Sequence, residues 1–255
     1  MISIDNSRAA FREMFSWCRD SMIYSYFEGN IGIGFADSID APVWAAVFSG
    51  DFVFLSGRAQ GVEELAARIG AMSHDVVLIP EDVAAWKEGL SACGLSLTEV
   101  TRFHTRVPKG GFDEGLLRGL AGQIARFKRG SLRPAGSEEY AELAACSWEN
   151  AFVANFRDEE DLREHGFAFC AYIGRDLAAA ASTFGYYSGG FELQIATRPD
   201  YRGQGLAVIC GARFLLECLE RGKTPHWDAA NETSLHIAEK LGFEPDGEYT
   251  ALEKE

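Results

Sequence analysis

The sequence has no long apolar run. No stretch approaches the roughly 20 residues that a helix needs to cross a bilayer. The first residues, MISIDNSRAAFREMF, carry charge within their apolar stretch and show no secretory pattern. We therefore expect a cytoplasmic protein with no membrane partner.

Basic residues are also scarce. The chain has 24 lysines and arginines against 38 aspartates and glutamates, which gives a net charge of -14. Such a field repels polyanions, so nucleic acid and anionic membranes are poor partners for the bulk of the surface. A small cationic substrate is compatible with this charge, although an acidic surface also simply keeps a protein in solution.

No pattern of cysteines or histidines indicates a metal site or a disulfide framework. The six cysteines form no C-x-x-C pair, and most of them lie in apolar stretches. We expect buried thiols in a reducing compartment. The five histidines are scattered, so we expect no bound metal.

The chain does contain alternating strand and helix patterns along its 255 residues. We predict an α/β protein of the α+β type, with an N-terminal lobe over 1–120 and a second domain over 125–255, the boundary falling somewhere in 108–130. The first lobe is predicted to contain strands at 43–48, 52–55, 76–79 and 97–107 and helices at 61–71 and 81–93. The second is predicted to contain helices at 137–150, 205–220 and 231–240 and strands at 167–173, 178–187, 191–197, 225–229 and 249–252.

The most informative segment is the glycine-rich turn at 202–207, Arg-Gly-Gln-Gly-Leu-Ala. It follows an apolar strand and opens a long amphipathic helix. A turn of this kind exposes several backbone N–H groups at the positive end of the helix dipole. That arrangement is suited to a phosphate or pyrophosphate.

Two familiar nucleotide loops do not fit this turn. A Walker loop needs Lys followed by Ser or Thr after its second glycine, where this chain has Leu206 and Ala207. A dinucleotide fingerprint needs a third glycine where this chain has Val208, and it needs a βαβ domain that has no room so late in the chain. A second G-x-G, at Gly32 and Gly34, fails in the same way and indicates a turn or a strand edge.

The turn resembles a third kind of loop. Arg202-x-x-Gly205-x-Ala207 is similar to the R/Q-x-x-G-x-G/A signature of the GNAT N-acetyltransferase superfamily, and HWDAANETSLHIAEKLGF (226–243) resembles the following strand and asparagine-capped helix of that fold. FELQIATRPDYRGQGLA, LLECLERGKTPHWDAANETS and AEKLGFEPDGEYTALE look like a bacterial GNAT subgroup that includes zwittermicin A resistance acetyltransferases. This closer resemblance covers about 165–255.

The resemblance implies a fold and a cosubstrate. The fold is a mixed, mostly antiparallel central sheet flanked by helices, preceded here by a smaller α/β lobe that is either a degenerate GNAT-like half or a support for the acceptor side. The cosubstrate is acetyl-CoA. By resemblance, the backbone of Ile195, Ala196 and Thr197 pairs with the pantetheine arm, and Asn231 reaches that arm while capping its helix. The main chain of six residues holds the pyrophosphate: Arg202, Gly203, Gln204, Gly205, Leu206 and Ala207.

The usual catalytic acid is missing. Many GNAT enzymes have a tyrosine seven residues after the asparagine, where this chain has Ala238. Four side chains are candidates for proton transfer: Glu192 and Asp228 as bases, Ser234 and Tyr249 as acids. Each also has an ordinary structural interpretation, such as packing or hydrogen bonding to backbone. His226 and His236 are further groups that titrate near neutrality when exposed.

The sequence thus predicts an acetyl-CoA-dependent N-acetyltransferase for a primary amine of a small molecule, acting as a monomer or homodimer. We expect the acceptor where the two halves meet, with weaker contact candidates at Trp148, Phe152, Asn155 and Phe156. A non-catalytic acyl-CoA-binding module is the alternative, because Ala238 replaces the acid. A nicotinamide-dependent oxidoreductase is a third, weaker interpretation.

Overall fold

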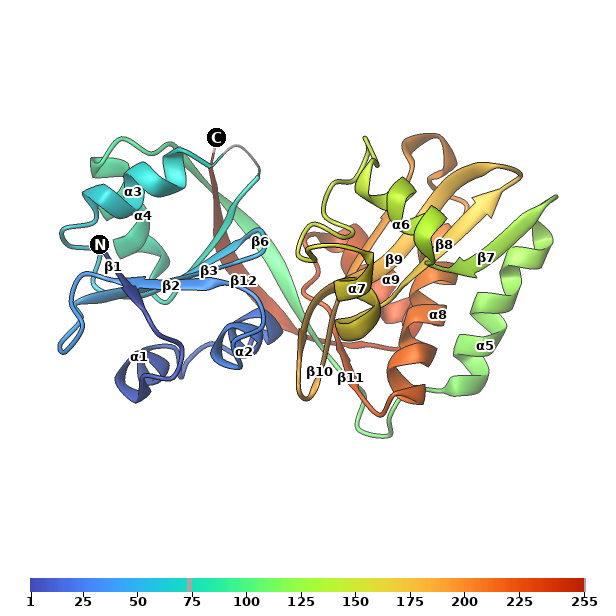
Figure 1. Cartoon of the computed structure of the whole chain (residues 1–255), viewed down its shortest axis with the longest axis horizontal. Coiled ribbons are helices and arrows are strands. Elements are labelled where there is room, and N and C mark those ends of the chain that lie inside the picture. Colours follow the sequence, from blue (N-terminus) through green and yellow to red (C-terminus); the bar gives the residue numbers. More distant parts are fainter. Residues whose placement is uncertain (73–74, 255) are drawn as a thin grey trace. The chain divides into compact units, whose positions relative to one another are not determined.

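The computed structural model describes residues 1–72 and 75–254 and divides into two compact units. One unit is Met1–Arg102 together with Glu248–Glu255, and the other is Phe103–Gly247. The divisions fall inside two long strands, β6 (Leu97–Arg106) and β12 (Glu244–Lys254), as Figure 1 shows by colour along the chain. The contacts therefore place residues 103–120 with the second unit, whereas the sequence pattern places them with the first.

The first unit is built on a mixed sheet with strand order β1-β2-β3-β4-β5-β12-β6. The strands predicted at 43–48 and 52–55 are present as β3 and β4, which pair antiparallel through a turn at Gly50. Trp44 and Trp86 are almost fully buried in its core, as their apolar surroundings in the sequence predict. The other elements of this unit are β1 (Ile2–Ile4), α1 (Ala9–Met14), α2 (Ser21–Phe27), β2 (Ile33–Ala36), β3 (Trp44–Ser49), β4 (Phe52–Gly57), α3 (Glu63–Gly70), β5 (Val77–Pro80) and α4 (Val83–Ala92).

The second unit contains a five-stranded sheet with order β11-β10-β9-β8-β7. Within this sheet β10 and β11 are parallel and the other neighbours are antiparallel. The strands predicted at 167–173, 178–187 and 191–197 are present as β8, β9 and β10, joined by hairpin turns near Gly174 and Gly189. Its elements are α5 (Glu114–Gly122), η1 (Gln123–Arg126), β7 (Gly130–Pro134), α6 (Ser137–Ala144), α7 (Glu159–His165), β8 (Ala168–Ile173), β9 (Asp176–Tyr187), β10 (Gly190–Thr197), η2 (Pro199–Tyr201), α8 (Leu206–Glu220), β11 (Thr224–His226) and α9 (Glu232–Leu241).

Both faces of this second sheet are covered by helices. Because side chains alternate along a strand, Phe169 and Ala171 of β8 join the core that includes α8, while Cys170 and Tyr172 join the core that includes Leu143 of α6 and Leu162 of α7. α8, with 15 residues, runs along the first of these faces. Among the described residues, no helix combines the length and the apolar character that a membrane crossing requires.

The cysteines are free thiols, as the sequence predicts. Cys18, Cys170, Cys210 and Cys218 are buried, whereas Cys93 and Cys146 are partly exposed. Burial raises the pKa of Cys170 to about 12 and also raises the pKa values of Cys210 and Cys218. These three thiols are therefore protonated and unreactive at neutral pH.

Some predicted helices were wrong. The helix expected over 137–150 ends at Ala144, and Gly136 rather than Ser137 precedes its first residue. The Glu139 carboxylate accepts the Gly136 N–H at 3.1 Å and so satisfies the start of α6. The sequence analysis missed α7 and α5; three glycines in 114–122 hide the apolar stripe of α5, because glycine is a weak helix former.

Candidate functional site

The site begins where two parallel strands separate. β10 and β11 pair over only three residues each, from Gly190 with Thr224 to Glu192 with His226. Beyond this point β10 stays paired with β9 along its other edge as far as Thr197. The chain after β11 moves to a different partner, since Ala229 bridges to Phe103. The edge of β10 over 193–197 is thus left without a neighbouring strand among the described residues.

A cavity of about 610 Å³ lies beside this open edge. It is lined by the end of β10, the glycine-rich turn, the first turn of α8 and the first turns of α9. Nine of the ten residues predicted to contact the cosubstrate line it: Ile195, Ala196, Thr197, Arg202, Gly203, Gly205, Leu206, Ala207 and Asn231. The tenth, Gln204, lines a neighbouring cavity instead.

The glycine-rich turn has a conformation that requires glycine. Gly203 and Gly205 have φ angles of 74° and 81°, in the left-handed region that other residues rarely adopt. Gly205 is the N-cap of α8, and no side chain caps this helix. The first N–H groups of a helix lack intrahelical partners, so those of α8 are available at the positive end of its dipole. The turn is therefore built to hold an anion.

Two arginines brace this turn. Arg202 Nε donates a hydrogen bond to the Thr197 carbonyl at 3.2 Å, which ties the turn to the end of β10. Arg126 of η1 donates from Nη2 to the Gln204 carbonyl. The sequence analysis missed Arg126, and it also missed Lys240, which lines the cavities on both sides of the turn. Neither residue lies in the motif, and only the packing of η1 and α9 brings them to it.

The start of α9 forms another wall of the cavity. Asn231 is the N-cap, and its Oδ1 accepts the Ser234 N–H at 3.0 Å, as the sequence predicts. This leaves the amide NH₂ of Asn231 without a protein partner among the described residues. Ser234 lines the cavity and is partly exposed, whereas Ala238, one turn further on, is fully buried in the core.

Two carboxylates lie where β10 and β11 separate. Glu192 is only 5% exposed, and its Oε1 accepts the Asp228 N–H at 2.9 Å. The pairing of β10 with β9 shifts register between Glu192 and Leu193, as at a β-bulge. The Asp228 side chain is also buried, and its Oδ2 lies 3.8 Å from Nδ1 of His104 on β6. Nothing in the local sequence predicts His104, because the contact joins distant parts of the chain.

Tyr249 lies in the other compact unit. There its hydroxyl accepts a hydrogen bond from Arg102 Nε at 3.2 Å. This contact gives the side chain a structural partner, and its part in proton transfer stays a prediction.

The two histidines of this region differ sharply. His226 is partly buried, its Nε2 lies 2.9 Å from the Tyr187 hydroxyl, and this burial lowers its pKa to about 4. The expectation that it titrates near neutrality was therefore wrong. His236 has a 65% exposed side chain, as predicted, yet it lies at the rim of the cavity.

The lowered pKa of His226 predicts that the free energy of unfolding depends on pH. Its pKa is about 4 in the folded chain against 6.5 ordinarily, so between these values the unfolded chain binds a proton that the folded chain does not. The contribution of His226 to the free energy of unfolding is thus complete above pH 6.5. It is lost as the pH drops towards 4, by up to roughly 3 kcal/mol. His226→Gln, which keeps a partner for Tyr187, should remove most of this dependence in urea unfolding between pH 7 and about pH 4.5.

His236→Gln is the matched control, because that histidine is exposed and the substitution should leave the pH dependence unchanged. The pKa of Asp161 is lowered to about 2, chiefly by its hydrogen bond from Arg157. This carboxylate therefore changes the free energy of unfolding only below its ordinary pKa of 3.8. Its contribution is lost in a more acidic window than that of His226. An equal pH dependence in wild type and His226→Gln would contradict the assignment.

The aromatic residues proposed as acceptor contacts pack elsewhere. Phe152 and Phe156 are buried in the core beneath α6 and α7, and Trp148 packs edge-on against Phe152. Asn155 donates from its amide to the Phe184 carbonyl at 2.8 Å. The structure gives these residues packing and hydrogen-bonding roles, so we do not retain them as substrate contacts.

Comparison with known proteins decides the family. The model of the GNAT acetyltransferase family matches residues 12–252. The chain belongs to the GNAT acetyltransferase family. This match spans both compact units, so the N-terminal unit is part of the family's pattern rather than an addition to it.

Solved structures agree with this GNAT assignment. A GCN5-related N-acetyltransferase-like protein from Streptococcus suis 89/1591 is 29% identical, with a TM-score of 0.87 over 96% of this chain and 98% of that one. A tandem GNAT protein from the clavulanic acid biosynthesis pathway shares the fold at 14% identity, with a TM-score of 0.59 over 100% of this chain and 97% of that one. The predicted α/β GNAT fold is confirmed.

A curated relative matches a shorter region. The uncharacterized N-acetyltransferase YdfB of Bacillus subtilis (strain 168) is 36% identical over 87 residues, which is 33% of this chain and 33% of that protein. The match thus spans about a third of the relative's length. It supports an acyltransferase family without naming a substrate.

Proposed function

We propose that this GNAT protein transfers an acetyl group from acetyl-CoA to a primary amine of a small molecule. One observation carries the proposal: an uncapped helix N-terminus and an open strand edge face one cavity, which is lined by nine of the ten residues expected from the motif. An anion at the helix and an amide-bearing chain along the strand edge are the two features that coenzyme A combines.

The cosubstrate's orientation follows from this arrangement. With the diphosphate at the turn near Gly205, the pantetheine arm lies along β10 from Thr197 towards Leu193. Its acyl end then reaches the point where β10 and β11 separate. Glu192 and Asp228 lie at that point, so they are the carboxylates placed to act on an incoming amine.

We assign Glu192 as the proton acceptor. An ammonium group is not a nucleophile, so one proton must leave the amine before the nitrogen attacks the thioester carbonyl. Glu192 is held in place by the Asp228 N–H, which donates a hydrogen bond to its Oε1 and so orients the carboxylate. Asp228 and His104 beside it provide a path for the proton towards the surface, since the His104 side chain is 48% exposed.

Ser234 is the proposed donor to the departing thiolate. Its hydroxyl makes no hydrogen bond to protein among the described residues, and it lines the cavity. Ser234→Ala should lower kcat by roughly tenfold, the effect of losing one hydrogen bond to a charged group, while the Kd for acetyl-CoA stays unchanged. Steady-state kinetics and calorimetry measure the two quantities. Thr233→Ala is the matched control, and an equal loss of kcat in both variants would contradict the role of Ser234.

The amine itself is identified only by class. The net charge of -14 suits a cation. The narrower resemblance to zwittermicin A resistance acetyltransferases makes aminated antibiotics, zwittermicin A among them, the first amines to test. The cytoplasmic location and the state of monomer or homodimer remain predictions.

A non-catalytic acyl-CoA-binding module is the second candidate, and the buried Ala238 in place of the usual tyrosine favours it. The deciding experiment measures acetylation of a broad amine panel beside acetyl-CoA binding. Turnover of any one amine, lost on Gly205→Asp, supports the enzyme. Tight binding of acetyl-CoA with only trace acetylation of every amine supports the module.

A further inference from the structure

A further cavity, of about 460 Å³, lies beside the C-terminal half of α8, whereas the glycine-rich turn precedes the N-terminus of this helix. It lies beside the end of β7 at Pro134 and the start of β8, and residues of α6, α7 and α8 supply its other walls. It shares no lining residue with the coenzyme cavity. Along α8 the nearest residues of the two linings, Val208 and Arg213, are five positions apart, about 7.5 Å along the helix axis.

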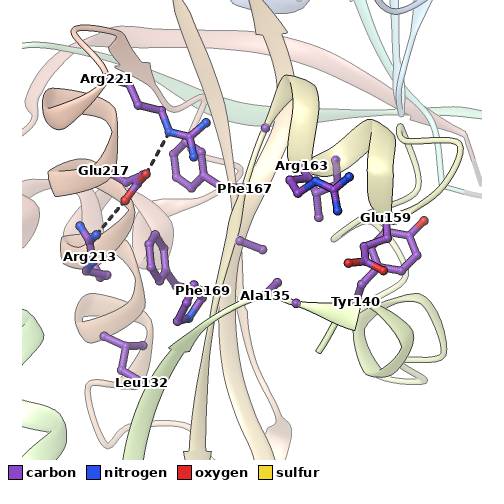
Figure 2. A pocket seen from close by; sticks show the side chains of 15 residues that line it. Leu132, Ala135, Tyr140, Glu159, Arg163, Phe167, Phe169, Arg213, Glu217 and Arg221 are labelled. Atoms are coloured by element: carbon purple, nitrogen blue, oxygen red, sulfur yellow. Dashed lines mark hydrogen bonds and ion pairs between the residues drawn. The ribbon is translucent and has the colours of Figure 1, made fainter. Parts of the chain in front are cut away.

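Arg213 and Glu217 of α8 and Arg221, the C-cap of this helix, form a charged row along one wall. Glu217 accepts from Arg213 Nη2 at 2.7 Å through one oxygen and from Arg221 Nε at 3.0 Å through the other, as the dashed lines in Figure 2 show. The two guanidinium groups lie over aromatic rings, Arg213 4.5 Å from the centre of Phe169 and Arg221 4.6 Å from that of Phe167. The row is therefore fixed in place by both charge and stacking.

This row leaves hydrogen-bond donors unused. Arg213 Nη1 is buried and has no hydrogen-bond partner, and within the described residues the terminal nitrogens of Arg221 also make none. Arg213 Nη2 has a second, longer contact to Glu220 at 3.4 Å. A buried guanidinium nitrogen without an acceptor costs free energy, and an anion in the cavity would satisfy it.

The rest of the lining limits the kind of anion. Figure 2 shows Arg163, Glu159 and Tyr140 on the side across from the row, with Phe167 and Phe169 between. Three arginines and two glutamates line the cavity, so their charges sum to +1. A single negative charge matches this sum, whereas the two glutamates would repel a dianion.

The remaining lining surface is largely apolar. The ring faces and edges of Phe167 and Phe169 are accompanied by aliphatic side chains, among them Leu132 and Leu162. The Tyr140 hydroxyl makes no hydrogen bond among the described residues. Burial, followed by the charges of Asp158, Asp161 and Glu159, raises the pKa of Tyr140, so the hydroxyl keeps its proton as a donor.

We propose that this cavity is a binding site for a small monocarboxylate with an apolar body, whose carboxylate takes the free donors of Arg213 and Arg221 and whose body packs among Leu132, Leu162 and Phe167. The site does not depend on acetyl transfer. It belongs to the second compact unit alone.

The test is equilibrium binding of benzoate and hexanoate to the full-length chain by calorimetry. Benzamide and inorganic phosphate serve as a neutral isostere and a small multivalent anion. We expect saturable binding of at least one carboxylate at millimolar concentration, with at least about tenfold weaker binding of benzamide and phosphate. Absence of carboxylate binding, or equal binding of benzamide or phosphate, overturns the proposal.

Variants locate the site. Arg213→Met removes the guanidinium group and keeps an unbranched aliphatic side chain, and we expect it to weaken carboxylate binding at least about tenfold, as Arg221→Met should also do. Arg175→Met, at an exposed turn outside the cavity, is the matched control and should bind like wild type. Melting curves identify any variant that fails to fold. Undiminished binding in both folded arginine variants would overturn the assignment to this cavity.

Discussion

Replacing Gly205 with aspartate is expected to weaken acetyl-CoA binding by at least roughly 100-fold, with turnover at sub-saturating acetyl-CoA falling in parallel. Two effects act together. The new side chain must adopt a φ of 81°, and its carboxylate lies at the helix N-terminus that holds the diphosphate. Two like charges at this distance repel each other most strongly where water is excluded. Calorimetric titration with acetyl-CoA measures the loss.

Two controls separate charge from backbone strain. Gly205→Ala has the same φ and a Cβ but no charge, so we expect a loss nearer to tenfold. Gly174→Asp places the same residue at a φ of 67° in an open hairpin turn far along the chain, and it should leave binding unchanged. Equal binding by wild type and a folded Gly205→Asp variant would contradict a diphosphate at this turn.

Glu192→Gln is expected to lower kcat by roughly 100-fold or more, the range seen when a general base is lost. The glutamine keeps the volume, and its amide oxygen still accepts the Asp228 N–H, so the separation of β10 and β11 is preserved. The Kd for acetyl-CoA should therefore stay within a factor of about two. The acidic limb of the pH profile of kcat/KM should also move or disappear. Kinetics across pH with any accepted amine measure both effects.

Asp228→Asn is the companion variant. If Asp228 only relays the proton, this change costs less than Glu192→Gln, because the first acceptor remains. A loss confined to thermal stability, with an unchanged pH profile in Glu192→Gln, would show that Glu192 only holds the two strands together. The base would then have to be sought elsewhere in the site.

The cofactor side of the site was predictable because it is local in sequence. The turn at 202–207 needs left-handed backbone at two positions, and only glycine adopts this conformation without strain. The two glycines in the sequence therefore indicate the conformation of the turn. The same holds for Asn231, which caps the helix that follows it. The fold of 165–243 followed for the same reason, since its strands and helices alternate with clear hairpin turns.

The catalytic side was less predictable because it is assembled from distant segments. His104 reaches Asp228 only through the pairing of Phe103 with Ala229, and Arg126 reaches the turn only through η1. The low pKa of His226 depends on burial, which a short strand of three residues does not reveal in sequence. The row of Arg213, Glu217 and Arg221 has ordinary helix spacing, and the cavity beside it is assembled from segments distant in sequence, β7, α6, α7 and β8.

A crystal structure with acetyl-CoA tests the central claim most directly. The account predicts diphosphate oxygens within hydrogen-bonding distance of the main-chain N–H groups of residues 203–208, the pantetheine arm along 195–197, and the thioester near Glu192. A carrier bound elsewhere on the chain, or crystals and solutions that take up none at millimolar concentration, would contradict it.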